Sequence, residues 1–289
     1  MLGIYEKALP VDVSWQERLT IAKDLGFDFV EMSIDESDAR LARLDWQQPD
    51  LEQVRQAIMN TGIPVLSLCL SGHRRYPLGS LDARVRQTAL QMMEQAIRIA
   101  SYLGIRDIQL AGYDVYYEQK SPLTREYFIE DLRKCVAMAA KHCVMLSIET
   151  MDDPFINSLQ KIQLIKRQIH SPWLQAYPDI GNISAWPEND LGTELELGIG
   201  NIAQVHLKDT KNVTTTSDGQ FKNVPFGEGD VDFVGALRTL QRLGYHGPYM
   251  IEMWSGENSV DPVSEVRKAK KFITQQFELA EVQDECLKS

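Results

Sequence analysis

Short apolar segments recur along the chain, and each follows a longer segment with helical spacing. The junctions between them carry Gly26, Gly62, Gly104 and Gly244, each preceded by Leu or Thr. Glycine directly after a helix accepts the left-handed backbone conformation that closes the last helical turn. Each junction therefore predicts the end of one helix, followed by a strand.

The alternating apolar and polar segments predict eight strands, near residues 2–7, 28–34, 64–70, 107–113, 145–150, 174–181, 202–209 and 249–254. Helical patterns fill the intervals. Ser14 and Glu17 form a capping box that opens the first helix, and Pro49 lies in the first turn of the second. The remaining helices are predicted over residues 82–102, 124–142, 158–169, 189–198, 232–243 and 261–280.

Strict alternation of strands and helices predicts an α/β protein with a parallel sheet. Eight strands and eight helices within 289 residues are typical of a (β/α)8 TIM barrel, here a single domain over residues 1–289. A doubly wound open sheet is the alternative. It is weakened in its dinucleotide-binding form because no G-x-G-x-x-G follows the first strand.

The seventh predicted strand carries an unusual polar face. Gln204, His206 and Lys208 alternate with Val205 and Leu207. A buried cation or imidazole costs several kcal/mol unless it is paired or bound to a partner. This strand therefore needs partners from other strands.

Carboxylates late in three other strands supply such partners: Glu149, Asp179 and Glu252. Strand alternation aims them and His206 into the barrel interior, at the end where TIM barrels keep their chemistry. Three carboxylates and an imidazole would repel and desolvate one another without a cation among them. Oxygen and nitrogen ligands without thiolate suit a divalent metal ion such as Zn²⁺, Mn²⁺, Mg²⁺ or Co²⁺. The alternative is that each group is separately salt-bridged or solvated.

The overall charge limits the partners. The formal net charge is -11, which argues against a nucleic-acid partner but not against a small phosphorylated ligand held by a local cationic patch. The beginning of the chain lacks the features of a signal peptide, and no apolar run is long enough for a membrane span. A cytoplasmic protein without a membrane partner is expected. The irregular stretch 208–231 follows His206 directly, and loops of that length in a compact domain are usually functional.

Several motifs resemble a known family. Ser-Ile-Glu-Thr at 147–150, Tyr-Pro-Asp-Ile-Gly-Asn at 177–182 and Val-His-Leu-Lys-Asp-Thr at 205–210 resemble the xylose isomerase-like TIM barrels. Cys-Leu-Ser-Gly-His-Arg-Arg at 69–75 and Asn-Val-Pro-Phe-Gly-Glu-Gly at 223–229 are similar to the group of L-ribulose-5-phosphate 3-epimerases, also described as L-xylulose-5-phosphate 3-epimerases. The resemblance runs from about residue 2 to 275, and one departure from the group is Gly72 in place of Ala.

The resemblance implies a carbohydrate epimerase of the isomerase class. Glu149, Asp179, His206 and Glu252 would bind one divalent metal ion. The reaction would remove the C3 proton of a ketopentose 5-phosphate, and the metal would stabilise the enediolate that forms. Glu149 and Glu252 would be the catalytic acid and base on the two faces of that intermediate. Roles in carbohydrate, pentose phosphate and L-ascorbate metabolism are further implications of the resemblance.

Candidate substrate-binding residues lie in the loops after the strands. Ser71, His73 and Arg74 belong to the best local basic cluster, and Lys222 lies in the long loop. Both regions are candidates for phosphate contact, although solvated loop charges or a turn-capping His73 are equally open. Other candidates are Glu6 and Tyr113 for sugar hydroxyls and Lys208 for a substrate oxygen. Tyr113 could instead be packing, and Lys208 could pair with Asp209.

Other functions remain open at this point. A related sugar isomerase, or an epimerase of unphosphorylated ketoses, would share the metal site. An apurinic-site endonuclease shares the barrel, but five histidines and a charge of -11 leave this chain without the extra ligands and the basic face. A non-catalytic sugar-binding barrel would not need both Glu149 and Glu252. A homodimer is compatible with the sequence.

Overall fold

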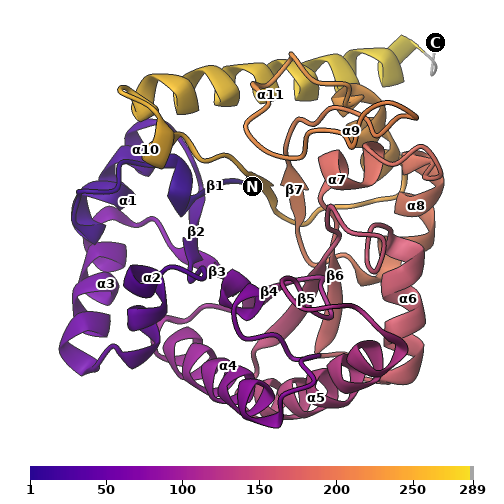
Figure 1. Cartoon of the computed structure of the whole chain (residues 1–289). Helices are drawn as coiled ribbons and strands as arrows, with labels where there is room; N and C mark the ends of the chain where they lie inside the picture. The colour runs from indigo at the N-terminus through magenta and orange to yellow at the C-terminus, as the bar shows by residue number, and fades with distance from the viewer. Residues whose placement is uncertain (287–289) are drawn as a thin grey trace.

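The computed structural model describes residues 1–286, and within them eight parallel strands form one sheet that curls into a ring (Figure 1). The strands are β1 Leu2–Tyr5, β2 Phe29–Ser33, β3 Val65–Cys69, β4 Asp107–Ala111, β5 Met145–Glu149, β6 Leu174–Tyr177, β7 Val205–Leu207 and β8 Tyr249–Ile251. Their order is β6-β5-β4-β3-β2-β1-β8-β7. The first strand thus lies between the second and the last.

Two isolated bridges join the ends of this sheet. Ala176 pairs with Ile202, and Asp179 pairs with His206, both in parallel register. The backbone N–H of His206 also donates to the carbonyl of Pro178 at 2.9 Å. The predicted (β/α)8 TIM barrel is therefore confirmed, and the open doubly wound sheet is excluded.

Helices surround the ring of strands on its outer side (Figure 1). The outer helices are α1 Trp15–Asp24, α3 Gln48–Thr61, α4 Ala83–Leu103, α5 Pro122–Lys141, α6 Leu159–Gln168, α8 Leu191–Gly198, α9 Phe233–Arg242 and α11 Pro262–Cys286. Three short helices, α2 Asp38–Leu41, α7 Ile180–Ser184 and α10 Ser255–Asn258, lie in the segments that follow β2, β6 and β8. The capping box of Ser14 and Glu17 is present, and Gly62 and Gly104 end their helices with φ of 74° and 76°. Within the described part of the chain, no helix combines the length and apolar character needed to cross a bilayer.

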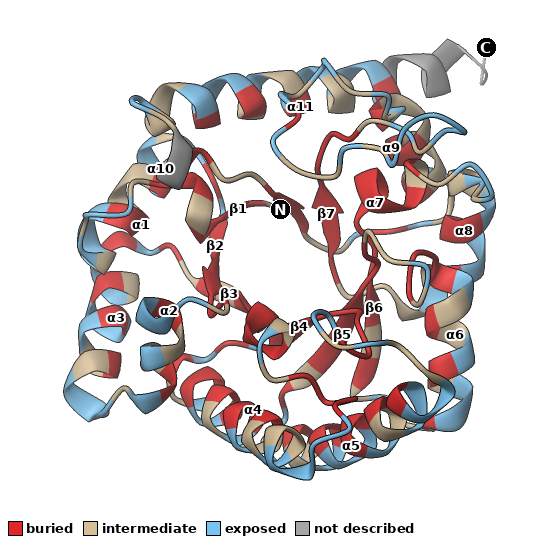
Figure 2. Ribbon diagram, viewed as in Figure 1, coloured by how far each residue is buried: buried red, intermediate tan, exposed pale blue. Residues whose placement is uncertain are grey.

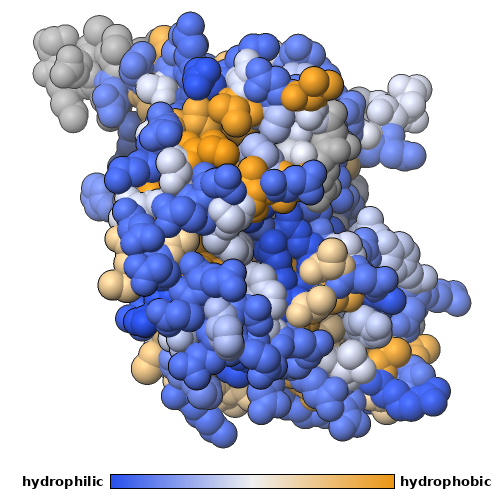
Figure 3. All heavy atoms as spheres, turned by 90° about the vertical axis from the view of Figure 1, so that its left-hand side faces the viewer, coloured by the Kyte–Doolittle hydropathy of each residue, from blue (hydrophilic) through white to orange (hydrophobic). Residues whose placement is uncertain are grey.

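The hydrophobic core lies between the strands and the inner faces of the helices. Strands are buried along their length, whereas helices alternate between buried and exposed faces (Figure 2). Ile4, Met32, Leu68 and Ile148 have no exposed surface and belong to this layer. The side of the molecule that carries α1 and α3 is largely hydrophilic, with hydrophobic residues gathered in separate groups (Figure 3). The polar inward faces of the strands are left to line the barrel interior.

The sixth strand is shorter than the sequence predicts. It ends at Tyr177, and Asp179 is the N-cap of α7, with its side chain accepting from the backbone N–H of Asn182. Pro178 lacks a backbone N–H and cannot donate to a neighbouring strand. The prediction that this strand runs to residue 181 is therefore wrong, and a helix begins where the strand was expected to continue.

Candidate active site

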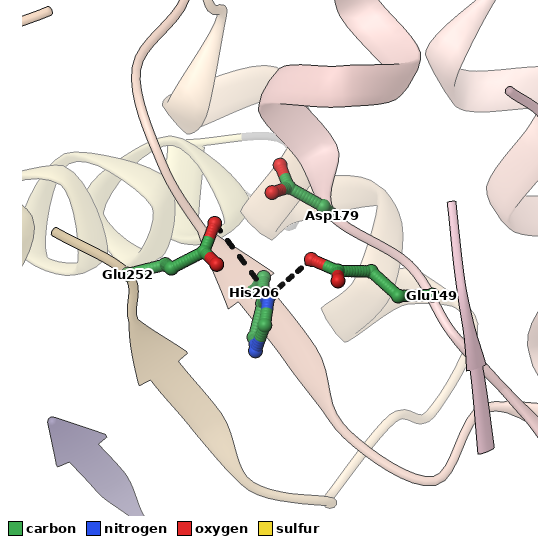
Figure 4. Close-up of side chains that lie close together, drawn as sticks. All are labelled: Glu149, Asp179, His206 and Glu252. Carbon is green, nitrogen blue, oxygen red and sulfur yellow. Dashed lines mark hydrogen bonds and ion pairs between the residues drawn. The ribbon is translucent and has the colours of Figure 1, made fainter. Parts of the chain in front are cut away.

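Four acidic and histidine side chains converge at the carboxyl ends of four strands. Glu149 ends β5, Asp179 follows β6, His206 lies in β7 and Glu252 follows β8. One ligand atom from each lies within 4.8 Å of the others, and all four residues are buried. Figure 4 shows the three carboxylates and the imidazole ring turned toward a common point. Strand alternation, which predicted this convergence, applies to Glu149 and His206, whereas Asp179 and Glu252 lie just past the ends of their strands.

Charged contacts connect the cluster internally. His206 Nδ1 lies 2.7 Å from Glu149 Oε1 and 3.9 Å from Glu252 Oε2. Lys208 Nζ lies 2.6 Å from Asp179 Oδ2 and 2.9 Å from Glu252 Oε2. Lys208 therefore pairs with two carboxylates of the cluster rather than with Asp209.

The two glutamates have pKa values displaced in opposite directions. Burial raises the pKa of Glu149 to about 7, against the opposing effect of His206. Burial would also raise the pKa of Glu252, but Lys208 and His206 lower it to about 2. Burial likewise raises the pKa of Asp179, with Lys208 opposing it. The surroundings of the two glutamates therefore differ, and Lys208 stabilises the charge on Glu252.

The donor set fits a divalent metal ion. It consists of carboxylate oxygens and one imidazole nitrogen, which suit hard or borderline cations. Asp179 Oδ1 accepts from the N–H of Asn182, while its buried Oδ2 accepts no hydrogen bond of good geometry and faces only Lys208. His206 Nε2 lies 3.3 Å from Oε1 of Glu31, outside the cluster, so Nδ1 is the nitrogen that faces the carboxylates of the cluster. These residues could therefore hold a metal.

A cavity of about 390 Å³ opens onto two of these side chains. Its walls include Glu149 and Glu252, together with Ser71, Arg74 and Lys222. Among the described residues, neither Arg74 nor Lys222 forms an ion pair, although both are partly buried. Arg74 lies over the rings of Tyr113 and Tyr116, and Lys222 lies over Trp254. The cavity thus holds two cations without a carboxylate partner beside a carboxylate-rich cluster.

The structure separates the predicted substrate-binding residues into two groups. Ser71, Arg74 and Lys222 line the cavity, and Lys208 belongs to the acidic cluster. Tyr113 does not line this cavity; its ring packs against the guanidinium of Arg74, and its hydroxyl donates a hydrogen bond to Asp152.

Glu6 and His73 are not brought to the cavity wall. Glu6 is buried among Arg18, Arg40 and Arg43, with its two carboxylate oxygens engaged by Arg43. His73 is buried with its Nε2 3.1 Å from the carbonyl oxygen of Ala89 in α4. For these two residues the geometry therefore supports structural roles instead of the predicted contacts with substrate.

Other cavity-lining residues were not assigned from the sequence. They are Tyr5, Lys7, Asp35, Glu36, Ser37, Cys69, Asn223 and Trp254. Tyr5 and Cys69 are the last residues of β1 and β3, so their position at strand ends was a usable signal. Asn223 and Lys222 come from the long loop after β7, so this loop reaches the cavity.

Comparison with known proteins identifies the family. A family model described as xylose isomerase-like TIM barrel matches residues 19–276. L-ribulose-5-phosphate 3-epimerase UlaE of Escherichia coli is 53% identical over 272 residues, covering 94% of this chain and 93% of its own. SgbU of Haemophilus influenzae, to which the same activity is provisionally assigned, is 50% identical over 279 residues, with 96% and 97% covered. These relatives are carbohydrate epimerases of the isomerase class by name.

Solved structures of low sequence identity share the fold. An L-ribulose 3-epimerase superposes with a TM-score of 0.79 at 18% identity and covers 100% of this chain and 98% of its own. A D-allulose 3-epimerase from Methylomonas sp. gives a TM-score of 0.77 at 17% identity, with 95% and 97% covered. The chain belongs to the xylose isomerase-like TIM barrel family and, within it, to the group of L-ribulose-5-phosphate 3-epimerases.

Proposed function

We propose that this protein interconverts L-ribulose 5-phosphate and L-xylulose 5-phosphate by epimerisation at C3. One observation carries the proposal: Glu149 and Glu252 converge with Asp179 and His206 beside a cavity that also holds unpaired cations. The acidic cluster provides for proton transfer and metal binding, and the cations provide for a phosphate. The 53% identical UlaE supports the same substrate.

Glu149, Asp179, His206 and Glu252 would hold the metal, which when bound polarises the C2 carbonyl and stabilises negative charge on the substrate oxygens. Which of Zn²⁺, Mn²⁺, Mg²⁺ or Co²⁺ is used depends on affinity and supply. His206 would bind as neutral imidazole through Nδ1. Lys208 holds Glu252 and Asp179 in place through its two ion pairs.

Glu149 and Glu252 are proposed to move the proton. In one direction, the ionised Glu252 takes the C3 proton, and the C–H electron pair forms the C2–C3 double bond of an enediolate. Glu149 then donates its proton to C3 from the opposite face as the C2 carbonyl forms again. Glu149 and Glu252 lie on either side of His206 (Figure 4), which favours this division of roles, because the acid and the base act on opposite faces of the intermediate. In the reverse direction the roles exchange.

Arg74 and Lys222 are proposed to bind the substrate phosphate, with Ser71 as a neighbouring hydroxyl donor. A partly buried guanidinium whose Nε lacks a hydrogen-bond partner and that has no carboxylate partner is costly unless a ligand supplies the negative charge. Arginine also presents paired N–H donors that suit phosphate oxygens. This proposed contact distinguishes a sugar phosphate from a free ketose.

Solvent deuterium exchange at C3 tests the function. Metal-loaded enzyme is incubated in D₂O with L-ribulose 5-phosphate or with unphosphorylated L-ribulose, and the C3 proton is followed by NMR. Exchange with the phosphate alone, lost in Glu149→Gln, supports the proposal. Equal exchange with both sugars would favour a general ketose epimerase. No exchange, in protein shown to hold metal, would refute C3 chemistry and favour an isomerase or a sugar-binding protein.

The remaining expectations are tested separately. We propose a single domain over residues 1–289 and a cytoplasmic location, where sugar phosphates are metabolised. Limited proteolysis tests the first, and fractionation of the native cells tests the second. The homodimer stays a prediction, which sedimentation of the full chain tests.

A further inference from the structure

Glu31 is a buried carboxylate in the barrel interior that neither joins the acidic cluster nor lines the cavity. It lies in β2 with no exposed surface. Its Oε2 accepts hydrogen bonds from Ser67 Oγ at 2.6 Å and from the Tyr177 hydroxyl at 3.0 Å. Its Oε1 lies 3.3 Å from Nε2 of His206. Glu31 therefore meets the imidazole on the side opposite to the cluster.

The contacts of the ring fix which nitrogen faces which group. Nδ1 of His206 lies 2.7 Å from Glu149, whereas Nε2 faces Glu31. Neutral imidazole carries one ring proton, and the hydrogen bond made by one nitrogen decides which nitrogen keeps it. A carboxylate is an acceptor only, so it places the proton on Nε2 and leaves the lone pair on Nδ1 for a metal. The ring of Tyr177 packs edge-on against the imidazole, with 4.3 Å between the ring centroids, and this contact limits rotation of the imidazole.

We infer that Glu31 is a positioning residue that holds His206 in the tautomer and orientation required for metal binding. The inference rests on the proposed metal site and adds a residue that acts through His206. Ser67 and Tyr177 direct Glu31, because their hydroxyls occupy Oε2 and leave Oε1 for the imidazole. Packing alone does not call for a carboxylate at this position, since an amide of the same shape would fill it without a buried charge.

Asp107 offers a matched control in the same interior. It is buried at the start of β4, and it accepts from Ser147 Oγ at 2.6 Å and from Gln204 Nε2 at 3.3 Å. Gln204 Oε1 in turn lies 3.4 Å from the hydroxyl of Tyr177. Within the described part of the chain, Asp107 makes no hydrogen bond or ion pair with His206. Asp107→Asn therefore removes a buried carboxylate from the same layer without touching the proposed metal ligand.

The test measures metal affinity and the state of the ring. Zn²⁺ is titrated by calorimetry, with chelator competition, into wild type, Glu31→Gln and Asp107→Asn. Loss of a carboxylate behind a ligating histidine weakens metal binding about 10- to 100-fold in other sites. We expect that loss in Glu31→Gln and a change below about threefold in Asp107→Asn, which leaves the imidazole contacts intact.

Nitrogen-15 NMR of labelled histidine in the Zn²⁺-loaded protein gives a second readout. Wild type should show His206 protonated at Nε2 alone, and Glu31→Gln should show a weakened or mixed pattern. Wild-type affinity with an unchanged His206 signal in Glu31→Gln would overturn the inference. If Glu31→Gln does not fold, Glu31→Asp, which keeps the charge but withdraws it from Nε2, is measured under the same criteria. Failure of wild type itself to bind metal would instead refute the proposed metal site.

Discussion

Glu6 is the best place to test how a buried charge supports this barrel. Its side chain has no exposed surface and follows β1 directly. Arg43 engages both of its oxygens at 2.7 Å, Arg40 lies at 2.5 Å and Arg18 at 3.5 Å. These arginines come from α1, α2 and the turn Ala42–Asp45. Glu6→Gln keeps the shape of the side chain and removes the charge that joins these elements.

The size of the effect follows from the pKa. Burial alone would raise the pKa of Glu6, but Arg43, Arg40 and Arg18 lower it from 4.5 to about 2. A shift of one unit corresponds to 1.36 kcal/mol, so the ionised form contributes roughly 3 kcal/mol to the free energy of unfolding. Breaking a buried ion pair by removing one partner costs about 3–5 kcal/mol in other proteins. We therefore expect Glu6→Gln to lower the stability at pH 7 by about 3 kcal/mol.

Urea unfolding at pH 7, followed by circular dichroism, measures this difference. Glu52→Gln is the control, because Glu52 pairs with Arg55 on an exposed helix surface, where such pairs contribute about 0–1 kcal/mol. A depressed pKa gives stability that is present above the unfolded pKa and lost as pH falls. The difference between wild type and Glu6→Gln should therefore shrink between pH 4.5 and about 2. A stability loss below about 1 kcal/mol, with a raised KM for the sugar phosphate, would contradict this reasoning and restore Glu6 as a substrate contact.

Three further predictions concern the site. Glu149→Gln and Glu252→Gln should each lower kcat at least about 100-fold in both directions, because either one removes a proton-transfer group, and NMR of the interconversion measures this. Arg74→Ala and Lys222→Ala should each raise KM for the sugar phosphate about 10-fold or more without changing KM for the free ketose, as steady-state kinetics would show. Metal affinity should rise with pH, because His206 must lose a proton to bind the metal. Glu149 and Glu252 raise the pKa of His206 well above 6.5, against the effect of burial. Calorimetry in buffers of different ionisation enthalpy counts the protons released, and a pH-independent affinity would contradict the ligand assignment.

The alternation of strand and helix patterns along the chain predicted the fold, and the alternation of residues within strands predicted the inward direction of the ligands. Successive side chains in a strand point to opposite faces, so the positions of Glu149 and His206 within their strands were enough to predict that both point inward. The same rule failed at Asp179, because Pro178 ends the ladder and Asp179 caps a helix. Its carboxylate nevertheless reaches the cluster, since the cap uses only Oδ1. The residue was predicted correctly as part of the convergence, although its local structure was not.

Residues beyond the strand ends could not be placed in this way. Ser71–Arg74 is a 3-10 helix with about three residues per turn, so Ser71 and Arg74 share one face and His73 points elsewhere. That is why the first two line the cavity while His73 turns to the carbonyl of Ala89. Glu6 also lies in a 3-10 turn, where strand alternation no longer applies. Strand alternation therefore could not predict which of these side chains face the cavity.

The surroundings of two arginines explain why one stabilises the fold while the other is left for a ligand. Arg43 has a carboxylate partner, Glu6, and its charge is neutralised inside the protein. Arg74 is held by the faces of Tyr113 and Tyr116, at 5.5 and 5.4 Å from the ring centroids. Cation–π contacts orient a guanidinium but do not cancel its charge. An aromatic support therefore fixes Arg74 in the cavity and still leaves its positive charge to an incoming phosphate, whereas a carboxylate support would compete with that phosphate.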